Sequence, residues 1–225
     1  ASSLAEDCKA LGTDDFLCLP RQASDTTLSL LMQMANRAGL SLMLDNAGQL
    51  GTDLPGQFLA GPGIPAWNTK SMELLRNAGC RAVVISTELS KQDISYLAQA
   101  SVQTILPVYG RAMVMQLNHC PERTFRGLSG SQTSCRLCQA NQGTQGQYLK
   151  DRLGARFPLF PVRLPEGCLN ALLFHTPVHL YKKAIGRHWL LDFTLEDENS
   201  MMSLVKAYSA LLDGRDTSPA ADIPL

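Results

Sequence analysis

The sequence predicts an α/β fold built on a parallel sheet and interrupted by a stretch that carries cysteines. Strand-like and helix-like segments follow one another with short connections through the first half of the chain. The strand-like segments are apolar throughout and show no clear alternation, which is typical of a sheet covered on both faces. This pattern breaks at about residue 119 and returns near residue 188. We therefore expect an insertion at about 119–187 within an otherwise regular α/β domain.

The helices are predicted from apolar residues at helical spacing and from residues that cap helix ends. The segment 26–37 carries such a pattern and stops before Gly39, and Gly79 closes the segment 69–78 in the same way. Ser90 is the expected N-cap of the helix that follows it. The expected helices are 2–11, 26–37, 69–78, about 91–100 and about 198–212.

The strands are predicted from short apolar runs that end at turn-forming residues. Pro20 ends the first run, for example. Residues 112–117 either extend the preceding strand past Gly110 or form a strand of their own. The remaining residues, 213–225, are rich in Asp, Pro and Ala and are expected to be a linker or a truncated tail. The expected strands are 16–19, 41–44, 58–60, 82–85, 104–108 and 188–193.

The composition is that of a globular domain. With 225 residues, 45% of them hydrophobic, the chain can bury a large core, and we expect one domain over residues 1–212. Twenty basic and twenty acidic residues leave no net charge that would draw the chain to nucleic acid or to an anionic membrane. There is no long apolar run and no signal-peptide pattern. We therefore expect a cytoplasmic protein without membrane contact.

Four of the seven cysteines are spaced like thiolate ligands. Cys120, Cys135, Cys138 and Cys168 form the pattern C-x14-C-x2-C-x29-C. Two thiolates separated by two residues can turn toward one ion or cluster, as in zinc ribbons and iron–sulfur sites. An odd number of cysteines without a secretory signal favours reduced thiols. Four thiolates select soft metals, so both a zinc site and an iron–sulfur cluster are compatible with this pattern. The gap of 29 residues before Cys168 is untypical of compact zinc ribbons.

Several segments resemble the peptidase U32 family, which is also described as collagenase-like. The segments are 86–90 (STELS), 108–111 (VYGR), 118–121 (NHCP) and 151–158 (DRLGARFP). The resemblance covers roughly residues 40–212. Two positions depart from the family pattern: Tyr109 stands where histidine is frequent, and Leu169 stands where arginine usually follows the last cysteine.

The resemblance implies a partial TIM-type (β/α) barrel that contains the later strands, with the functional site at the carboxyl ends of those strands. Some family members carry a [4Fe–4S] cluster on four cysteines and hydroxylate an RNA base or the ubiquinone ring without oxygen. For this chain, the resemblance implies such a cluster on the four cysteines named above and an RNA base or small aromatic as the substrate. A partial barrel leaves an open sheet edge, so the remaining barrel or another domain of a longer protein is an expected partner.

Three residues are candidates for catalysis. Glu88 follows a strand and could act as a general base, or it could cap the next helix. Tyr109 and Arg111 flank the turn glycine, where the ring could stack on a substrate and the guanidinium could hold an anion. The alternatives are a packed tyrosine and a surface arginine.

Four further residues are candidates for substrate binding. Arg152 and Arg156 could hold an anionic donor or a phosphate, or they could form ion pairs with Asp151 that fix their loop. Asn46 and Asn68 end strand-like runs and could line a pocket, although asparagine in such places often only forms a turn.

The resulting prediction is a U32-type protein that modifies an RNA base or a small aromatic by [4Fe–4S]-dependent hydroxylation. A U32 peptidase is the first alternative, but the chain has no HExxH, no GxSxG and no local cysteine-protease signature. A zinc-stabilised binding module is the second alternative.

Overall fold

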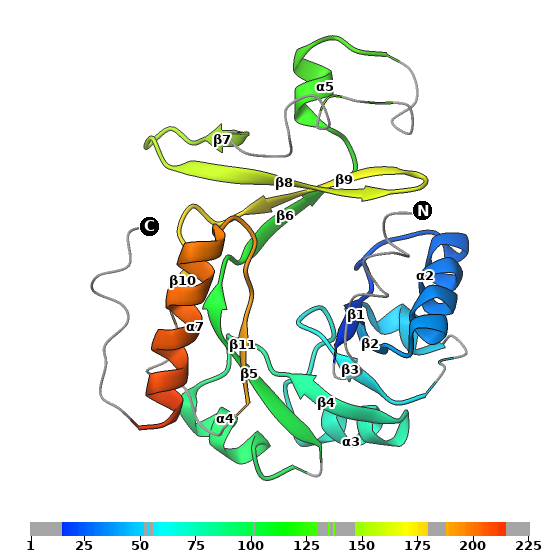
Figure 1. Cartoon of the computed structure of the whole chain (residues 1–225), viewed down its shortest axis with the longest axis vertical. Coiled ribbons are helices and arrows are strands. Elements are labelled where there is room, and N and C mark those ends of the chain that lie inside the picture. Colours follow the sequence, from blue (N-terminus) through cyan, green and yellow to red (C-terminus); the bar gives the residue numbers. More distant parts are fainter. Residues whose placement is uncertain are drawn as a thin grey trace. The chain divides into compact units, whose positions relative to one another are not determined.

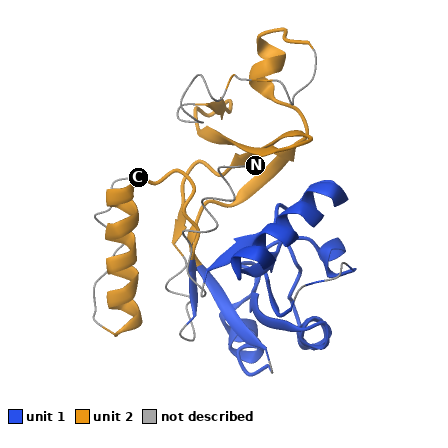
Figure 2. Cartoon of the chain, turned by 45° about the vertical axis from the view of Figure 1, so that its right-hand side comes forward, with its two compact units in different colours: residues 1–107, 183–190 blue, residues 108–182, 191–225 orange. Residues whose placement is uncertain are grey.

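In a computed structural model of the chain, the described residues are 15–51, 54, 56–100, 102–129, 135, 137, 147–179 and 188–214. They form a mixed α/β structure of strands and five α-helices (Figure 1). The chain divides into two compact units, residues 1–107 with 183–190 and residues 108–182 with 191–225 (Figure 2). The expected helix 2–11 and the end of the expected tail, residues 215–225, lie outside the described residues.

The first unit contains a parallel sheet whose strands lie side by side in chain order. Each strand pairs in parallel with the next one. Helices occupy the connections, and α2 packs on β2 while α3 packs on β4. The elements are β1 (Phe16–Cys18), α2 (Asp25–Ala38), β2 (Ser41–Leu44), the 3-10 helix η1 (Ala47–Gly51), β3 (Phe58–Ala60), α3 (Thr69–Asn77), β4 (Cys80–Val84), α4 (Lys91–Leu97) and β5 (Gln103–Gly110), which continues into the second unit.

Side-chain caps set the beginnings of these helices. Ser24, Asn68 and Ser90 each accept a hydrogen bond from a backbone N–H in the first turn of α2, α3 and α4. Gly39 ends α2 in the left-handed conformation with φ of 72°. The predicted cap at Ser90 is thus confirmed, but α4 ends at Leu97, three residues before the expected end.

The core of the first unit is formed by apolar residues of the strands and of the inner helix faces. The strand residues of β3, of β4 apart from Arg81 and of the end of β5 are buried in runs, as expected for a covered sheet, whereas burial alternates along β2 and β1 is largely exposed. This burial stabilises the unit by about 25 cal/mol for each Å² of apolar surface removed from water. Buried members include Leu42, Leu44, Phe58, Leu59, Met72, Leu75, Val83, Val84, Ile94 and Leu97.

The second unit contains an antiparallel sheet in the order β6-β9-β8-β7. Separately, the end of β5 pairs in antiparallel fashion with β10, where His179 lies opposite Tyr109. A long helix, α7, ends the described part of the unit. The elements are β6 (Met113–Leu117), α5 (Pro121–Phe125), β7 (Tyr148–Lys150), β8 (Arg156–Leu164), β9 (Gly167–Leu173), β10 (Val178–His179), the end of β11 (Trp189–Leu191), which begins in the first unit, and α7 (Glu198–Leu212).

The region 119–187 contains more regular structure than the sequence indicated. Strands β8 and β9 form a hairpin within it, and β6 is a separate strand of the same sheet. Pro158 and Pro161 lie within β8, and proline argues against a central strand because it cannot donate to the ladder. Among the described residues, β7 pairs with β8 only at Arg156–Pro158, so most of β8 has a partner on one side alone.

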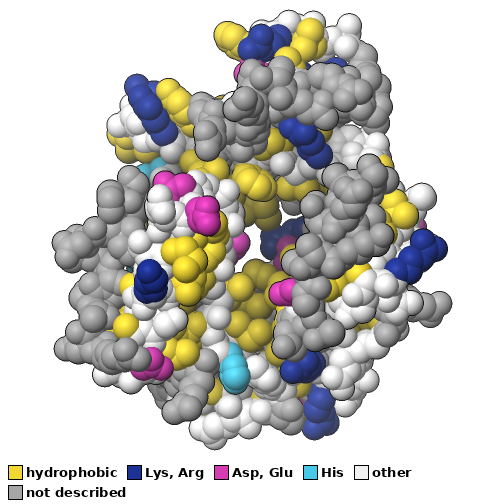
Figure 3. Space-filling model, viewed as in Figure 1, with side chains coloured by type: hydrophobic (Ala, Val, Ile, Leu, Met, Phe, Trp, Pro, Cys, Tyr) yellow, Lys and Arg dark blue, Asp and Glu magenta, His cyan; other side chains and the backbone are white. Residues whose placement is uncertain are grey.

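Helix α7 leaves part of its apolar surface exposed. Hydrophobic side chains gather over it in Figure 3, and Met202, Val205 and Leu212 are exposed, whereas Leu204 and Tyr208 are buried. Only one narrow face of α7 is therefore buried in its own unit. No helix in the described part of the chain is long and apolar enough to cross a membrane.

We expect Gly63→Ala to lower the free energy of unfolding of the first unit by about 2 kcal/mol, the typical cost of overpacking. A Cβ added to Gly63 would overlap the carbonyl oxygen of Asp45, which is backbone and cannot swing away. The matched control is Gly51→Ala, where a Cβ meets open space. Urea unfolding of both variants tests this, and equal midpoints would contradict the close packing at Gly63.

Candidate functional site

Cys120 and Cys168 approach the same end of the β6-β9-β8 sheet. Cys168 lies on β9, and Asn170 lies on the same face of that strand because side chains two residues apart point the same way. The buried Asn170 amide donates a hydrogen bond of 3.1 Å to the backbone oxygen of His119. This bond fixes the peptide just before Cys120, which is itself buried at the start of α5. The thiol of Cys120 does not cap that helix.

Cys135 is connected to the same region by two arginines. Arg163 lies directly opposite Cys168 in the β8–β9 pair, which places both side chains on one face of the sheet. Arg123 lies in α5, one turn after Cys120. The pKa of Cys135 is lowered, chiefly by a hydrogen bond from the backbone N–H of Leu137 and further by the positive charges of Arg123 and Arg163. Cys135 therefore lies near Arg123 and Arg163, the two arginines that neighbour Cys120 in the sequence and Cys168 in the sheet.

Cys138, the fourth candidate ligand, lies outside the described residues. Among the residues that are described, no group of three or more His, Cys, Asp or Glu side chains is arranged to hold a metal ion. None of the described cysteines takes part in a disulfide. The described part of the chain therefore contains thiols outside any disulfide at Cys120, Cys135 and Cys168 but no completed ligand set.

Tyr109 is part of a buried polar cluster in the second unit. It is 5% exposed, and its hydroxyl donates a hydrogen bond of 2.7 Å to Glu196. Burial and the hydrogen bond to that carboxylate raise the pKa of Tyr109. Its ring packs edge-on against His179 and also contacts Phe193. The ring is therefore a packed tyrosine, the alternative role considered for it above.

Arg111 lies beside the same cluster. Its guanidinium donates hydrogen bonds to the backbone oxygens of Phe174 (3.2 Å) and His175 (2.7 Å), and it lies 4.0 Å from the Glu196 carboxylate. Burial raises the pKa of Glu196, but hydrogen bonds from Tyr109 and from the backbone N–H of Thr194 outweigh it, so the pKa is lowered overall. Glu196 is thus an ionised, nearly buried carboxylate.

The buried polar side chains around Tyr109 extend to α7 through Tyr208. The Tyr208 hydroxyl donates to the backbone oxygen of Val108 (3.2 Å), which leaves it to accept from the Nδ1–H of His179 at 3.0 Å. Burial lowers the pKa of His179 and favours the neutral ring. Glu196 and Tyr208 were not among the predicted site residues, because nothing in their local sequence marks them; only the fold brings them to Tyr109.

Glu88, Asn46 and Asn68 belong to the first unit, where the two asparagines have structural roles. The Asn46 amide donates to the Arg21 backbone oxygen and accepts from the N–H of Gly48. Asn68 forms a capping box with Ser71 at the start of α3. Glu88 is exposed in the turn before α4, whose cap is Ser90. The structure does not bring these three side chains together with Tyr109 and Arg111 in one unit.

Asp45 and Arg21, which were not among the predicted site residues, form an ion pair in the first unit. The Asp45 carboxylate accepts from the Nε of Arg21 at 3.0 Å and from the N–H of Gly63. The Gln49 side chain connects the same two turns, because it accepts a hydrogen bond from the N–H of Asp45 and donates one to the backbone oxygen of Pro20. An Arg–Asp pair 24 residues apart carries no local motif, so the sequence alone did not reveal it.

Arg152 and Arg156 lie at or just before the start of β8, whereas Cys168 pairs with Arg163 near the other end of that strand. Arg156 begins β8, and seven residues separate it from Arg163, which corresponds to roughly 23 Å along an extended strand. Its guanidinium lies 4.7 Å from the centre of the Tyr148 ring. Asp151 holds the adjacent turn by accepting from the N–H groups of Leu153 and Ala155. These arginines and the cysteines therefore do not share one site.

Acidification is expected to destabilise the second unit in two stages. In the folded protein, the pKa of His179 lies below the ordinary value of 6.5, and the pKa of Glu196 lies below the ordinary value of 4.5. As the pH falls, each residue is therefore protonated in the unfolded chain before it is protonated in the folded chain. Stability is thus full above each ordinary value and falls as the pH drops below 6.5 and again below 4.5. Thermal melts between about pH 7 and pH 4 test this. His179→Gln should abolish the first stage, whereas the exposed-site control His188→Gln should not.

Comparison with known proteins identifies no matching family model, no matching curated protein and no matching solved structure.

Proposed function

We propose that this chain binds a [4Fe–4S] cluster through Cys120, Cys135, Cys138 and Cys168 and acts in a U32-type modification of an RNA base or a small aromatic. The observations that support the proposal are that Cys168 and the peptide before Cys120 lie at the same end of the β6-β9-β8 sheet, and that Cys135 lies near Arg123 and Arg163, which neighbour them in the fold. The hydrogen bond from Asn170 to the His119 oxygen holds this end together.

The charges around the cysteines fit such a cluster. Four thiolates and a [4Fe–4S] core carry a net negative charge, and its reduction potential depends on nearby charge and on hydrogen bonds to sulfur. Arg123 and Arg163 supply positive charge at Cys135, and the N–H of Leu137 donates to its sulfur. Arginine stays charged at every physiological pH, so the positive charge that offsets the negative charge of the cluster does not change with pH. A structural zinc would share the thiolates but has no redox role.

The cluster, when bound, would supply one-electron transfer. The chain itself would shape the environment: Arg123 and Arg163 would favour the reduced cluster, and Asn170 would hold the Cys120 segment against β9. The Tyr109–Glu196 pair would act indirectly by fixing the end of β5 and the segment before α7. In this proposal, Tyr109 and Arg111 are positioning residues and do not contact the substrate.

We also propose that the parallel strands of the first unit are the part of a (β/α) barrel that the resemblance implies. Five parallel strands lie in strict chain order, with helices in the connections. A barrel keeps this order, whereas a doubly wound sheet reverses it part-way. Strand β1 pairs on one side only among the described residues, which leaves an edge for the rest of a barrel from a longer chain or from a partner.

Anaerobic purification followed by an absorption spectrum and by iron, sulfide and zinc analysis tests the cluster. We expect a broad band near ~400 nm and about four irons per chain, the stoichiometry of the cluster. One zinc per chain without iron would overturn the proposal in favour of the zinc-stabilised module. For the reaction, nucleoside mass spectrometry of RNA from cells lacking the protein should reveal a nucleoside that has lost one oxygen atom. An unchanged nucleoside profile would move the search to small aromatic substrates.

A further inference from the structure

A pocket of about 260 Å³ lies within the first unit, at the amino ends of its parallel strands. Phe16 is the first residue of β1, Ser41 is the first residue of β2, and Gln57 directly precedes β3. Arg81 of β4 completes this part of the lining. Pockets for drug-sized ligands begin at roughly 300 Å³, so this one suits a smaller molecule. It belongs wholly to the first unit, whereas all the described candidate cysteine ligands belong to the second.

A bulge in the sheet directs Arg81 to this pocket. In the pairing of β3 with β4, Phe58 lies opposite Cys80 and Leu59 lies opposite Ala82, so Arg81 is the extra residue of β4. Bulges re-aim a side chain and are common beside functional sites. Arg81 is the exposed residue in a strand whose other residues are buried. It has no ion-pair partner among the residues that the structure describes.

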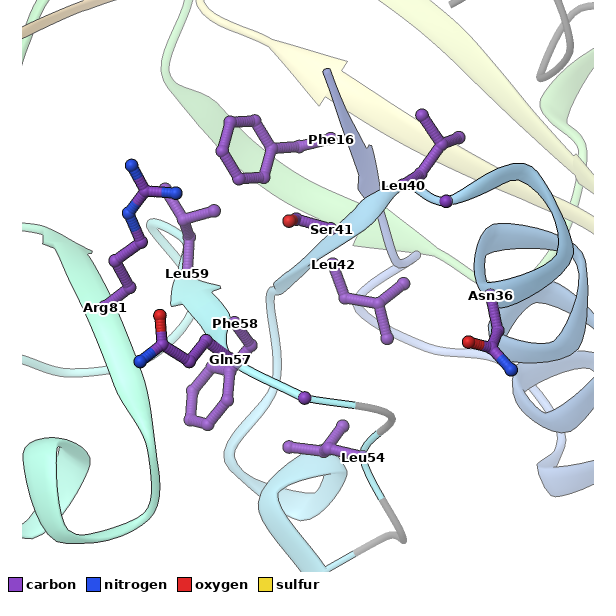
Figure 4. A pocket seen from close by; sticks show the side chains of 12 residues that line it. Phe16, Asn36, Leu40, Ser41, Leu42, Leu54, Gln57, Phe58, Leu59 and Arg81 are labelled. Atoms are coloured by element: carbon purple, nitrogen blue, oxygen red, sulfur yellow. The ribbon is translucent and has the colours of Figure 1, made fainter. Parts of the chain in front are cut away.

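Two neutral polar side chains accompany Arg81. Leu42 lies opposite Phe58 in the β2–β3 pair, so the preceding residues, Ser41 and Gln57, are neighbours across that pair. Figure 4 shows the Gln57 amide on the side of the pocket where Arg81 lies, with the Ser41 hydroxyl turned toward that side. A guanidinium, a hydroxyl and an amide are donors suited to one carboxylate or phosphate group.

Asn36 is a further polar residue of the lining, and the remaining lining side chains are apolar. Phe16, Leu40 and Leu54 contribute to the wall, and Phe16 is partly exposed. In Figure 4, Phe16 lies on the same side of the pocket as Arg81, and Leu40 and Asn36 lie toward the other side. We propose that this pocket binds a small organic anion, with its carboxylate or phosphate on Arg81 and its apolar body against Phe16 and Leu40. This site goes beyond the proposed function and does not depend on the cysteines.

The test uses ¹⁵N-labelled full-length chain and the probes benzoate, phenyl phosphate and benzamide. Benzoate and phenyl phosphate are expected to shift the amide signals of Ser41, Gln57 and Arg81, with a dissociation constant of about 1 mM for so small a ligand. The tighter of the two identifies the anionic group. Benzamide has the same ring without the charge and should bind at least tenfold more weakly.

Arg81→Gln should weaken benzoate or phenyl phosphate binding at least tenfold, whereas Arg81→Lys should retain part of it. Arg76→Gln is the matched control, because Arg76 is exposed on α3 and does not line the pocket. The Cys135→Ala variant should bind the two anions with the same affinity as the unmodified chain. This result would show that the pocket is independent of the proposed [4Fe–4S] site. Equal affinity for benzamide and benzoate, unchanged affinity in Arg81→Gln, or shifts confined to other residues would each overturn the inference.

Discussion

Cys135→Ala is expected to remove most of the iron from the anaerobically purified protein. A [4Fe–4S] cluster needs all four thiolate ligands in this type of site, and alanine supplies none. We expect the band near ~400 nm to fall to a small fraction of its original intensity. Cys135 is only partly buried, so its replacement should leave the apo fold intact. Circular dichroism melting of the apo proteins checks that point.

The matched control is Cys18→Ala. Cys18 is an exposed cysteine of the first unit and is not one of the proposed ligands, so its loss should leave the iron content unchanged. If Cys135→Ala retained the iron and sulfide of the unmodified chain, Cys135 would not be a ligand and the cluster assignment would fail. If both variants lost iron equally, the metal would be bound non-specifically.

Glu196→Ala is expected to lower the free energy of unfolding by about 3 kcal/mol, the cost of breaking a buried charged network. The Glu196 side chain is 7% exposed and accepts hydrogen bonds from the Tyr109 hydroxyl and from the N–H groups of Thr194 and Leu195. Its removal would leave these donors without an acceptor and the nearby Arg111 guanidinium without its carboxylate partner. For a chain of this size the melting temperature should fall by roughly 6–12 °C.

Glu198→Ala is a control two residues away, because Glu198 is exposed at the start of α7. It should change the melting temperature by no more than about 2 °C. Glu196→Gln should lie between the two, since the amide keeps the shape and one acceptor oxygen. Equal melting temperatures for Glu196→Ala and Glu198→Ala would show that the cluster around Tyr109 contributes little to stability.

Most elements of the first unit could be predicted because they depend on local signals. The expected strands 41–44 and 58–60 match β2 and β3, and the expected helix 26–37 differs from α2 by one residue at each end. Capping residues and glycines act within a few positions of the helix ends they determine. In the second unit, helix 198–212 was likewise predicted with its observed ends.

The hairpin of β8 and β9 could not be predicted in the same way. Prolines within β8 obscured the strand pattern, and hydrogen bonds to β9 along one edge, which a single sequence does not reveal, decide its structure. The same holds for the site residues. Tyr109 was selected from its place beside Gly110, but its partner Glu196 lies 87 residues further along the chain.

By itself, the sequence determined the α/β class, the order of the strands and helices of the first unit, and the spacing of the four cysteines. These properties follow from side-chain periodicity and from short-range capping. Only the tertiary structure decided that Cys168 and the segment before Cys120 lie at one end of a sheet, that Arg156 lies at the other end of β8, and that Arg81 lines a pocket. Each of these depends on strand pairing and register, because a shift of one residue turns a side chain to the opposite face.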